Sequence, residues 1–283
     1  MAAGNETVSQ AVKGALEQIQ QNAPDEFAKM NADPKVRDAV TEAARAAATE
    51  EIKLAHEFSS RPDQDIRERL AKYLPEDRIK LIEEALSIPT FRMEITQKSD
   101  GKYLVQMTRE GKEFLPSKEL AMVADIEWTS ILQEASILVE AILLVMNAVG
   151  VSLSVSESTM EATVEETARA IENSPALQRA IAEFISAWHA ASSALEKAKA
   201  IFVLLKDSYA AGILWTIIKS LCREMKWYDW LETAAKVTAM IIAALATEGA
   251  ALIAKIALIV MSAVDFIRKL ANLEKLKEIK QNL

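Results

Sequence analysis

The chain has 283 residues, of which 51% are hydrophobic and 26% charged, and this composition excludes a disordered chain. It contains only 7 Gly and 7 Pro, against roughly 20 and 14 at average usage, so few turn-formers are available for many short strands. The net charge of −8 has the wrong sign for a protein that neutralises nucleic-acid phosphates. We therefore expect a mainly α fold, a multi-helix bundle, and no nucleic-acid partner.

The first part of the chain, residues 1–116, is predicted to be a polar helical region that ends in a β-hairpin. Its clearest helix start is Asp33-Pro34, because Asp caps free amides and Pro fits the first helical turn. Pro62 and its neighbours are expected to end that helix. In chain order, the predicted helices cover residues 7–21, 25–30, 34–58, a short segment up to 73, and 75–86.

From Phe91 the sequence period changes from helical to alternating. Apolar and polar residues alternate over 91–95 and again over 103–107, and the turn-forming residues 98–101 lie between the two runs. This pattern predicts one small β-hairpin at about residues 91–108. An isolated two-stranded hairpin is marginal in water, so its apolar face should rest on helices.

The second part, residues 117–283, is predicted to be a more apolar helical bundle. Ser117 is interpreted as the N-cap of a helix that ends near Gly150. No proline follows Pro175, which favours long uninterrupted helices in the rest of the chain. The predicted helices of this part cover residues 117–149, 156–172, 175–205, 208–222 and about 229–270.

One segment, residues 237–264, carries only two charges, Glu248 and Lys255. As a single helix it would be about 42 Å long, more than the roughly 30 Å hydrocarbon core of a bilayer. The two charges recur with Ser262 and Lys269 every seven residues, which on one helix makes a narrow polar stripe. Such a stripe beside a wide apolar surface is typical of a nearly buried helix in a bundle.

The alternative for this segment is a helical hairpin. Gly249 permits a turn, so the arms would be residues 237–246 and 250–264. An apolar hairpin inside a shell of amphipathic helices, over residues 117–270, resembles the organisation of colicin-like and other α-helical pore-forming proteins. The resemblance implies a protein that stores hydrophobic helices in its interior and moves them into a membrane.

Two apolar runs, 141–155 and 237–264, are the predicted membrane-inserting elements. Protonation of Glu248 would remove the cost of inserting its charge, which makes it the predicted acidic switch. Aromatic rings with polar edges are expected either to anchor the chain at a membrane interface or to cap one end of the core. The insertion residues are Ala141, Leu143, Val145, Val237, Ile241, Leu245, Glu248, Gly249, Leu252, Ile256 and Ile259, and the interface anchors are Trp215, Trp227, Tyr228 and Trp230.

The sequence contains no catalytic or metal-binding motif. His56 and His189 are the only histidines, which excludes a multi-histidine metal site within one chain. A pairing of Cys222 with His189 as nucleophile and base is less typical than a buried core cysteine. Adjacent glutamates such as Glu50-Glu51 are expected to face different directions on a helix. We therefore expect no enzymatic activity, no cofactor and no metal.

These patterns lead us to expect a soluble helical protein that inserts into and permeabilises membranes, as an α-pore-forming toxin or cell-death effector does. Its partners would be membrane lipid and, on the membrane, further copies of itself. The alternatives are a non-catalytic scaffold, and a carrier that holds an apolar ligand between the 141–156 and 237–264 helices. Residues 1–10 lack a basic n-region and an apolar h-region, so no Sec-type signal peptide is predicted. The expected location is the cytoplasm, or a membrane reached by a non-classical route.

Overall fold

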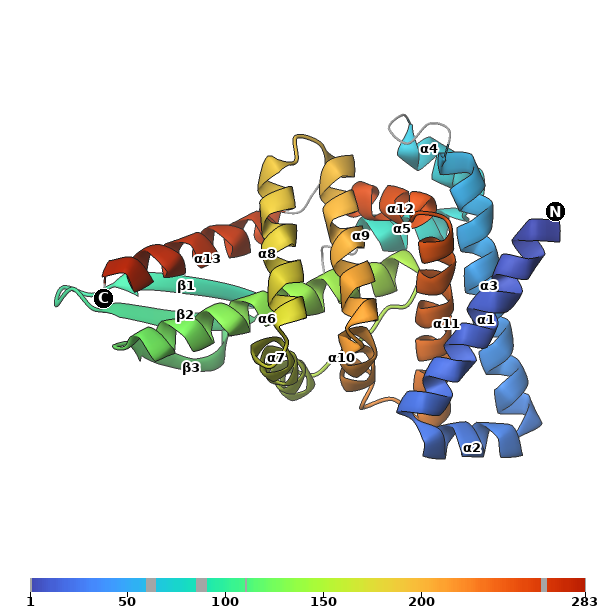
Figure 1. Cartoon of the computed structure of the whole chain (residues 1–283), viewed down its shortest axis with the longest axis horizontal. Coiled ribbons are helices and arrows are strands. Elements are labelled where there is room, and N and C mark those ends of the chain that lie inside the picture. Colours follow the sequence, from blue (N-terminus) through green and yellow to red (C-terminus); the bar gives the residue numbers. More distant parts are fainter. Residues whose placement is uncertain (1, 60–64, 85–90, 110, 261–263, 283) are drawn as a thin grey trace.

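The computed structural model describes residues 2–59, 65–84, 91–109, 111–260 and 264–282 (Figure 1). Within these ranges 13 helices and a small three-stranded antiparallel sheet make up a mainly α fold, as predicted. The helices are α1 (Ala2–Asn22), α2 (Pro24–Ala32), α3 (Pro34–Phe58), α4 (Ile66–Ala71), α5 (Glu76–Glu83), α6 (Val123–Ala148), α7 (Glu157–Glu172), α8 (Pro175–Ala190), α9 (Ala194–Ala210), α10 (Ile213–Leu221), α11 (Trp227–Ala246), α12 (Ala250–Val260) and α13 (Val264–Asn282), and the strands are β1 (Phe91–Gln97), β2 (Tyr103–Arg109) and β3 (Lys112–Leu120).

The N-terminal helices form one end of the molecule, where α1 and α3 both pack along α11 (Figure 1). The Asp33 carboxylate accepts hydrogen bonds from the backbone N–H groups of Lys35 and Val36, which confirms the predicted start of α3. Helix α5 ends at Glu83, and residues 85–90 lie outside the described part of the chain. Because α11 belongs to the second predicted part, helices from both parts share one hydrophobic core.

The predicted hairpin is confirmed as β1 and β2, with Ile95 opposite Val105 and Met93 opposite Met107. These four side chains are buried, so the apolar face of the hairpin rests on the core as expected. The strands extend away from the helical end of the molecule, alongside α6 and α13 (Figure 1).

Strand β3 was not predicted, and the helix expected from Ser117 starts later. Ser117 lies within β3, where its N–H and hydroxyl groups donate to the Glu113 carboxylate. Pro116 and an irregular register against β2 hide the alternation, and proline is tolerated because β3 is an edge strand. Helix α6 begins at Val123, where the Asp125 carboxylate accepts the Met122 N–H. The predicted boundary at residue 116 therefore falls inside a strand.

The single helix predicted over residues 175–205 is wrong, because the chain forms α8 and α9 with a break at 191–193. The Ser193 hydroxyl accepts the Glu196 N–H, and the Glu196 carboxylate accepts the N–H groups of Ser192 and Ser193. This reciprocal capping box starts α9 independently of α8. Its signature, Ser-x-x-Glu, was present in the sequence.

The long helix predicted from about residue 229 is likewise divided. Helices α11 and α12 meet at residues 247–249 and are bent by 112°, which is neither one straight helix nor a closed hairpin (Figure 1). Glu248 and Gly249 have positive φ angles of 53° and 72°, and a Cβ on Gly249 would lie 2.6 Å from the Phe202 ring of α9. Only glycine fits this corner without displacing the ring.

The heptad stripe expected across this segment does not form. Lys255 lies on α12 and Lys269 on α13, and each faces a different glutamate. Ser262, the third member of the stripe, lies outside the described residues. The bend at 247–249 removes the common helical face on which the seven-residue spacing depended.

Candidate functional site

By length and composition, α6 is the one described helix that could cross a membrane alone. Two bent pairs would qualify only if each formed one span: α9 with α10, bent by 97°, and α11 with α12. Within the most apolar 18-residue window of α6, 83% of the residues are buried in the fold. The candidate site is therefore α6, together with the polar contacts that hold it and α12 in the core.

Helix α6 runs from the sheet end of the molecule into its helical end (Figure 1). Residues 135–149 are buried without interruption, and they include the predicted insertion residues Ala141, Leu143 and Val145. Around α6 pack α5, α7, α9, α10, α12, α13 and β3. The most extensive of these contacts is with α7, an amphipathic helix that buries one face and whose glutamates are exposed or half-buried.

Several polar side chains of α6 are hydrogen-bonded within the helix itself. The hydroxyl groups of Thr129 and Ser136 donate to the backbone carbonyls of Asp125 and Gln133, and the Asn147 amide donates to Leu143. These hydrogen bonds would remain intact if α6 moved as a unit, because both the donor and the acceptor lie on α6. They satisfy these groups equally well in a protein core or in hydrocarbon.

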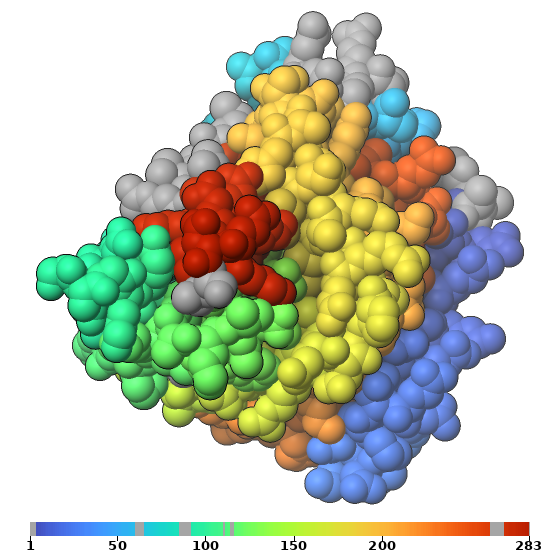
Figure 2. Space-filling model, turned by 60° about the vertical axis from the view of Figure 1, so that its left-hand side comes forward, coloured from blue at the N-terminus to red at the C-terminus, as the bar shows by residue number. Residues whose placement is uncertain are grey.

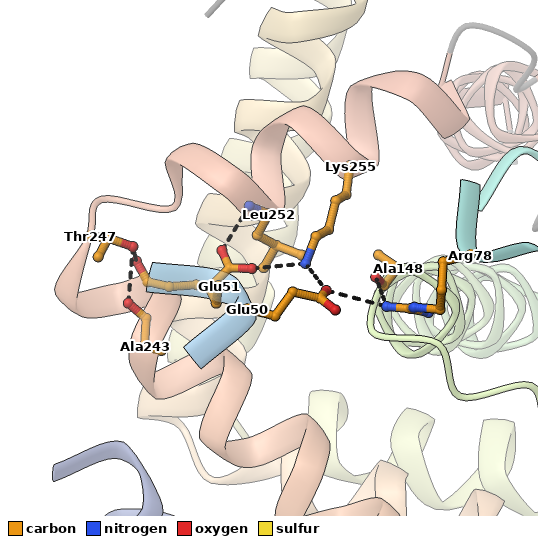
Figure 3. A network of polar contacts seen from close by, with 9 residues as sticks. Glu50, Glu51, Arg78, Ala148, Ala243, Thr247, Leu252 and Lys255 are labelled. Atoms are coloured by element: carbon orange, nitrogen blue, oxygen red, sulfur yellow. Dashed lines mark hydrogen bonds and ion pairs between the residues drawn. The ribbon is translucent and has the colours of Figure 1, made fainter. Parts of the chain in front are cut away.

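A buried ion cluster holds α12 against α3 (Figure 3). The Lys255 ammonium lies 2.8 Å from a Glu50 carboxylate oxygen and 3.2 Å from a Glu51 oxygen. The Glu51 and Lys255 side chains are both essentially fully buried. The other Glu51 oxygen accepts the Leu252 N–H at 2.8 Å, so Glu51 also caps the first turn of α12. The two adjacent glutamates therefore converge on one lysine, contrary to the expectation that they face apart.

Arg78 extends the same cluster to the C-terminal end of α6. Its guanidinium donates to Glu50 and to the Ala148 carbonyl, each at 3.3 Å (Figure 3). At Gly150, φ is +77° and a Cβ would overlap the Arg78 guanidinium, so a glycine there leaves room for the arginine. The cluster thus ties the end of α6 to the beginning of α12.

The two carboxylates of this cluster have pKa values shifted in opposite directions. Burial acts to raise the pKa of Glu50, but the charges and hydrogen bonds of Lys255 and Arg78 outweigh it and hold that pKa below its usual 4.5. Burial raises the pKa of Glu51 above its usual value despite Lys255. The charge of Glu50 therefore stabilises the fold above about pH 4.5, and this contribution is lost as the pH falls below that value.

The predicted insertion residues of the later segment lie on both sides of the α11–α12 corner. Leu245 is half-buried and Glu248 is exposed, whereas the corner residue Gly249 is buried against Phe202. The carboxylates buried against the apolar helices are Glu51 and Glu140, which the sequence analysis did not select. The remaining members are all buried: Val237 and Ile241 on α11, and Leu252, Ile256 and Ile259 on α12.

The four predicted interface anchors separate into two pairs. Trp215 and Trp230 are buried and meet edge to face, with ring centroids 6.2 Å apart. Trp227 and Tyr228 contact each other at the start of α11, where Trp227 is half-buried and Tyr228 is exposed. The first pair packs α10 against α11, and the second lies at the surface.

The residues considered for catalysis are not brought together as a nucleophile and base. Cys222 is buried, and desolvation raises the pKa of its thiol to about 12, so the thiol is protonated at neutral pH. His189 lies on α8, 3.4 Å from Glu274 of α13. Among the residues that the structure describes, no group of three or more His, Cys, Asp or Glu side chains could hold a metal ion.

No protein-family model, curated protein or solved structure gives a significant match to this chain.

Proposed function

We propose that this protein permeabilises lipid bilayers by inserting α6. The observation that carries the proposal is the combination found in α6 alone among the described helices: enough length and apolarity to span, and burial within surrounding helices. Packing in the core keeps these apolar side chains from water, and a bilayer would offer them an equivalent environment.

Helix α6 ranks before α11–α12, which the sequence had favoured. Insertion of α12 would separate the buried Lys255 from its partners on α3, and an unpaired lysine at the bilayer centre is costly. Insertion of α11 and α12 as one span would also need the 112° corner to straighten. Insertion of α6 also separates one buried ion pair, Glu140 with Lys269 of α13. The side chains of Thr129, Ser136 and Asn147 keep their hydrogen bonds within the helix, however, and α6 needs no corner to straighten.

Dye release from sealed vesicles tests the proposal. The protein is added to vesicles of phosphatidylcholine, with and without phosphatidylglycerol, at pH 7 and at pH 5. We expect release of the entrapped dye, and a shift in sedimentation when detergent is added to the protein. A scaffold would leave the vesicles sealed and its sedimentation unchanged, so the absence of leakage in both lipids at both pH values would overturn the proposal.

A further inference from the structure

Helix α13 lies in the angle between the sheet and α6 (Figure 2). In that view α13 is red, the strands are teal and α6 is green. Its apolar side is fully covered, since Leu270, Leu273, Leu276 and Ile279 are each no more than 3% exposed. The helix therefore depends on these neighbours to bury its apolar residues.

A row of opposite charges joins α13 to α6 in antiparallel order. Lys269 is ion-paired with Glu140, and the Lys280 ammonium lies 2.6 Å from a Glu127 carboxylate oxygen. Between these pairs, burial raises the pKa of the half-buried Glu134 to about 7, and the positive charge of Lys277 acts in the opposite direction. Glu127 and Glu140 are thus each ion-paired with a lysine of α13, and Asp125, at the start of α6, is paired with Lys118 of β3.

A second set of contacts joins α13 to β1, which is an edge strand of the sheet. The Asn272 amide donates to the Met93 carbonyl at 2.7 Å, and the Lys275 ammonium donates to the Ile95 carbonyl at 2.8 Å. These bonds occupy carbonyl groups that an edge strand otherwise leaves unpaired. Helix α13 therefore covers α6 and the edge of the sheet together.

The charge row is unevenly buried along its length. Lys269 and Glu140 are 3% and 7% exposed, whereas Lys280 and Glu127 are 46% and 53% exposed. Exposed ion pairs contribute little, and breaking a buried pair is much more costly. Release of α13 would accordingly begin at its C-terminal end.

Building on the proposed function, we propose that α13 is a clasp over α6 that exchanges its contacts for an anionic membrane surface. From Arg268 to Lys280 the sequence has five basic and two acidic residues. Such a helix lies in a membrane interface, with its apolar face in the acyl boundary and its lysines on anionic headgroups. In the folded chain α6 supplies carboxylate oxygens and β1 supplies backbone carbonyl oxygens, and the negatively charged headgroup oxygens would replace both.

The test removes the charges of the Glu127–Lys280 ion pair and of Glu134 and Lys277 from either side, in the whole chain and at pH 8, where Glu134 is mostly ionised. Glu127→Gln with Glu134→Gln loosens the clasp and leaves its lysines in place. Lys277→Gln with Lys280→Gln loosens it equally but removes lysines that would meet lipid. A quadruple variant combines both pairs of changes. Flotation measures binding to vesicles of phosphatidylcholine, with and without phosphatidylglycerol.

We expect the glutamate variant to bind anionic vesicles about threefold to tenfold more strongly than the wild type. The lysine variant should bind them about threefold to eightfold more weakly, since each of the two lost lysines contributes about fivefold and the loosened clasp offsets part of that loss. The quadruple variant should behave like the lysine variant. Zwitterionic vesicles should show little difference among the variants.

The controls break two exposed ion pairs far from α13, again from either side. Glu17→Gln with Glu165→Gln, and Lys13→Gln with Arg169→Gln, change the charge by the same amounts. If binding to anionic vesicles responded only to net charge, the control variants would change it as much as the clasp variants do. If it responded only to loss of stability, both clasp variants would bind more strongly than the wild type. Either result overturns the clasp, as does a quadruple variant that binds like the glutamate variant.

Failure of the clasp and failure of the proposed function give different results. If binding follows the predicted order but no variant releases entrapped dye, the proposal for α13 is supported and the proposal that α6 permeabilises membranes is rejected. If the vesicles leak but substitution of the α13 lysines does not change binding, permeabilisation is supported and the proposal for α13 is rejected.

Discussion

Replacement of Lys255 by Met is expected to lower the free energy of unfolding by about 3–5 kcal/mol, because it leaves a buried carboxylate without its cation. Glu51 is fully buried, and Lys255 is its ion-pair partner. Glu50 keeps its contact with Arg78, so the loss falls mainly on Glu51. Urea denaturation at pH 7, followed by far-ultraviolet circular dichroism, measures the change.

A second substitution separates the unpaired charge from the loss of packing. In the double variant Lys255→Met with Glu51→Gln, the Gln is neutral and its carbonyl oxygen can still accept the Leu252 N–H. We expect most of the lost stability to return. Lys13→Met, at an exposed pair on α1, should leave stability unchanged. A Lys255→Met variant as stable as the wild type would contradict the buried cluster.

Replacement of Ile131 by Lys is expected to slow dye release at least about tenfold. Ile131 is half-buried on α6, so the lysine can reach water in the folded chain. In a spanning α6 it adds a charge, which costs about 2.5–3.5 kcal/mol near the middle of a bilayer. Leakage from vesicles measures the effect, with the concentration of folded protein matched by circular dichroism.

The matched control is Ile52→Lys, at a half-buried position on α3, a helix that is not proposed to insert. This variant should release dye at the same rate as the wild type. Leu258→Lys places the same charge at a half-buried position of α12 and should have a smaller effect than Ile131→Lys. If Leu258→Lys abolished leakage and Ile131→Lys did not, α12 would replace α6 as the inserting element.

Local signals in the sequence were sufficient for most helix starts. Asp33 before Pro34 caps α3 as expected, and Ser174 before Pro175 caps α8 in the same way, because a cap is formed by residues within one turn. The β1–β2 hairpin was also predictable, since its alternation and its turn lie within one short segment. Strand β3 was not predicted because its own residues lack a regular alternation. Its strand conformation depends on pairing with β2.

The corner at Gly249 and the cluster at Lys255 depend on contacts far along the chain. Gly249 turns against Phe202, and Lys255 meets Glu50 and Glu51 on a helix about 200 residues earlier. A lysine in an otherwise uncharged run does indicate a buried carboxylate partner. The spacing of residues along the sequence does not identify that partner, because Glu50 and Glu51 lie on another helix. Both adjacent glutamates contact the lysine because its side chain is long enough to reach them.

Protease protection on vesicles tests insertion of α6 most directly. Vesicle-bound protein is digested with proteinase K, and the peptides that remain with the lipid are identified by mass spectrometry. If α6 inserts, a protected peptide covers most of Val123–Ala148 and is lost when the vesicles are dissolved in detergent. Complete digestion of α6 on leaking vesicles, or protection of α11–α12 alone, would contradict insertion of α6.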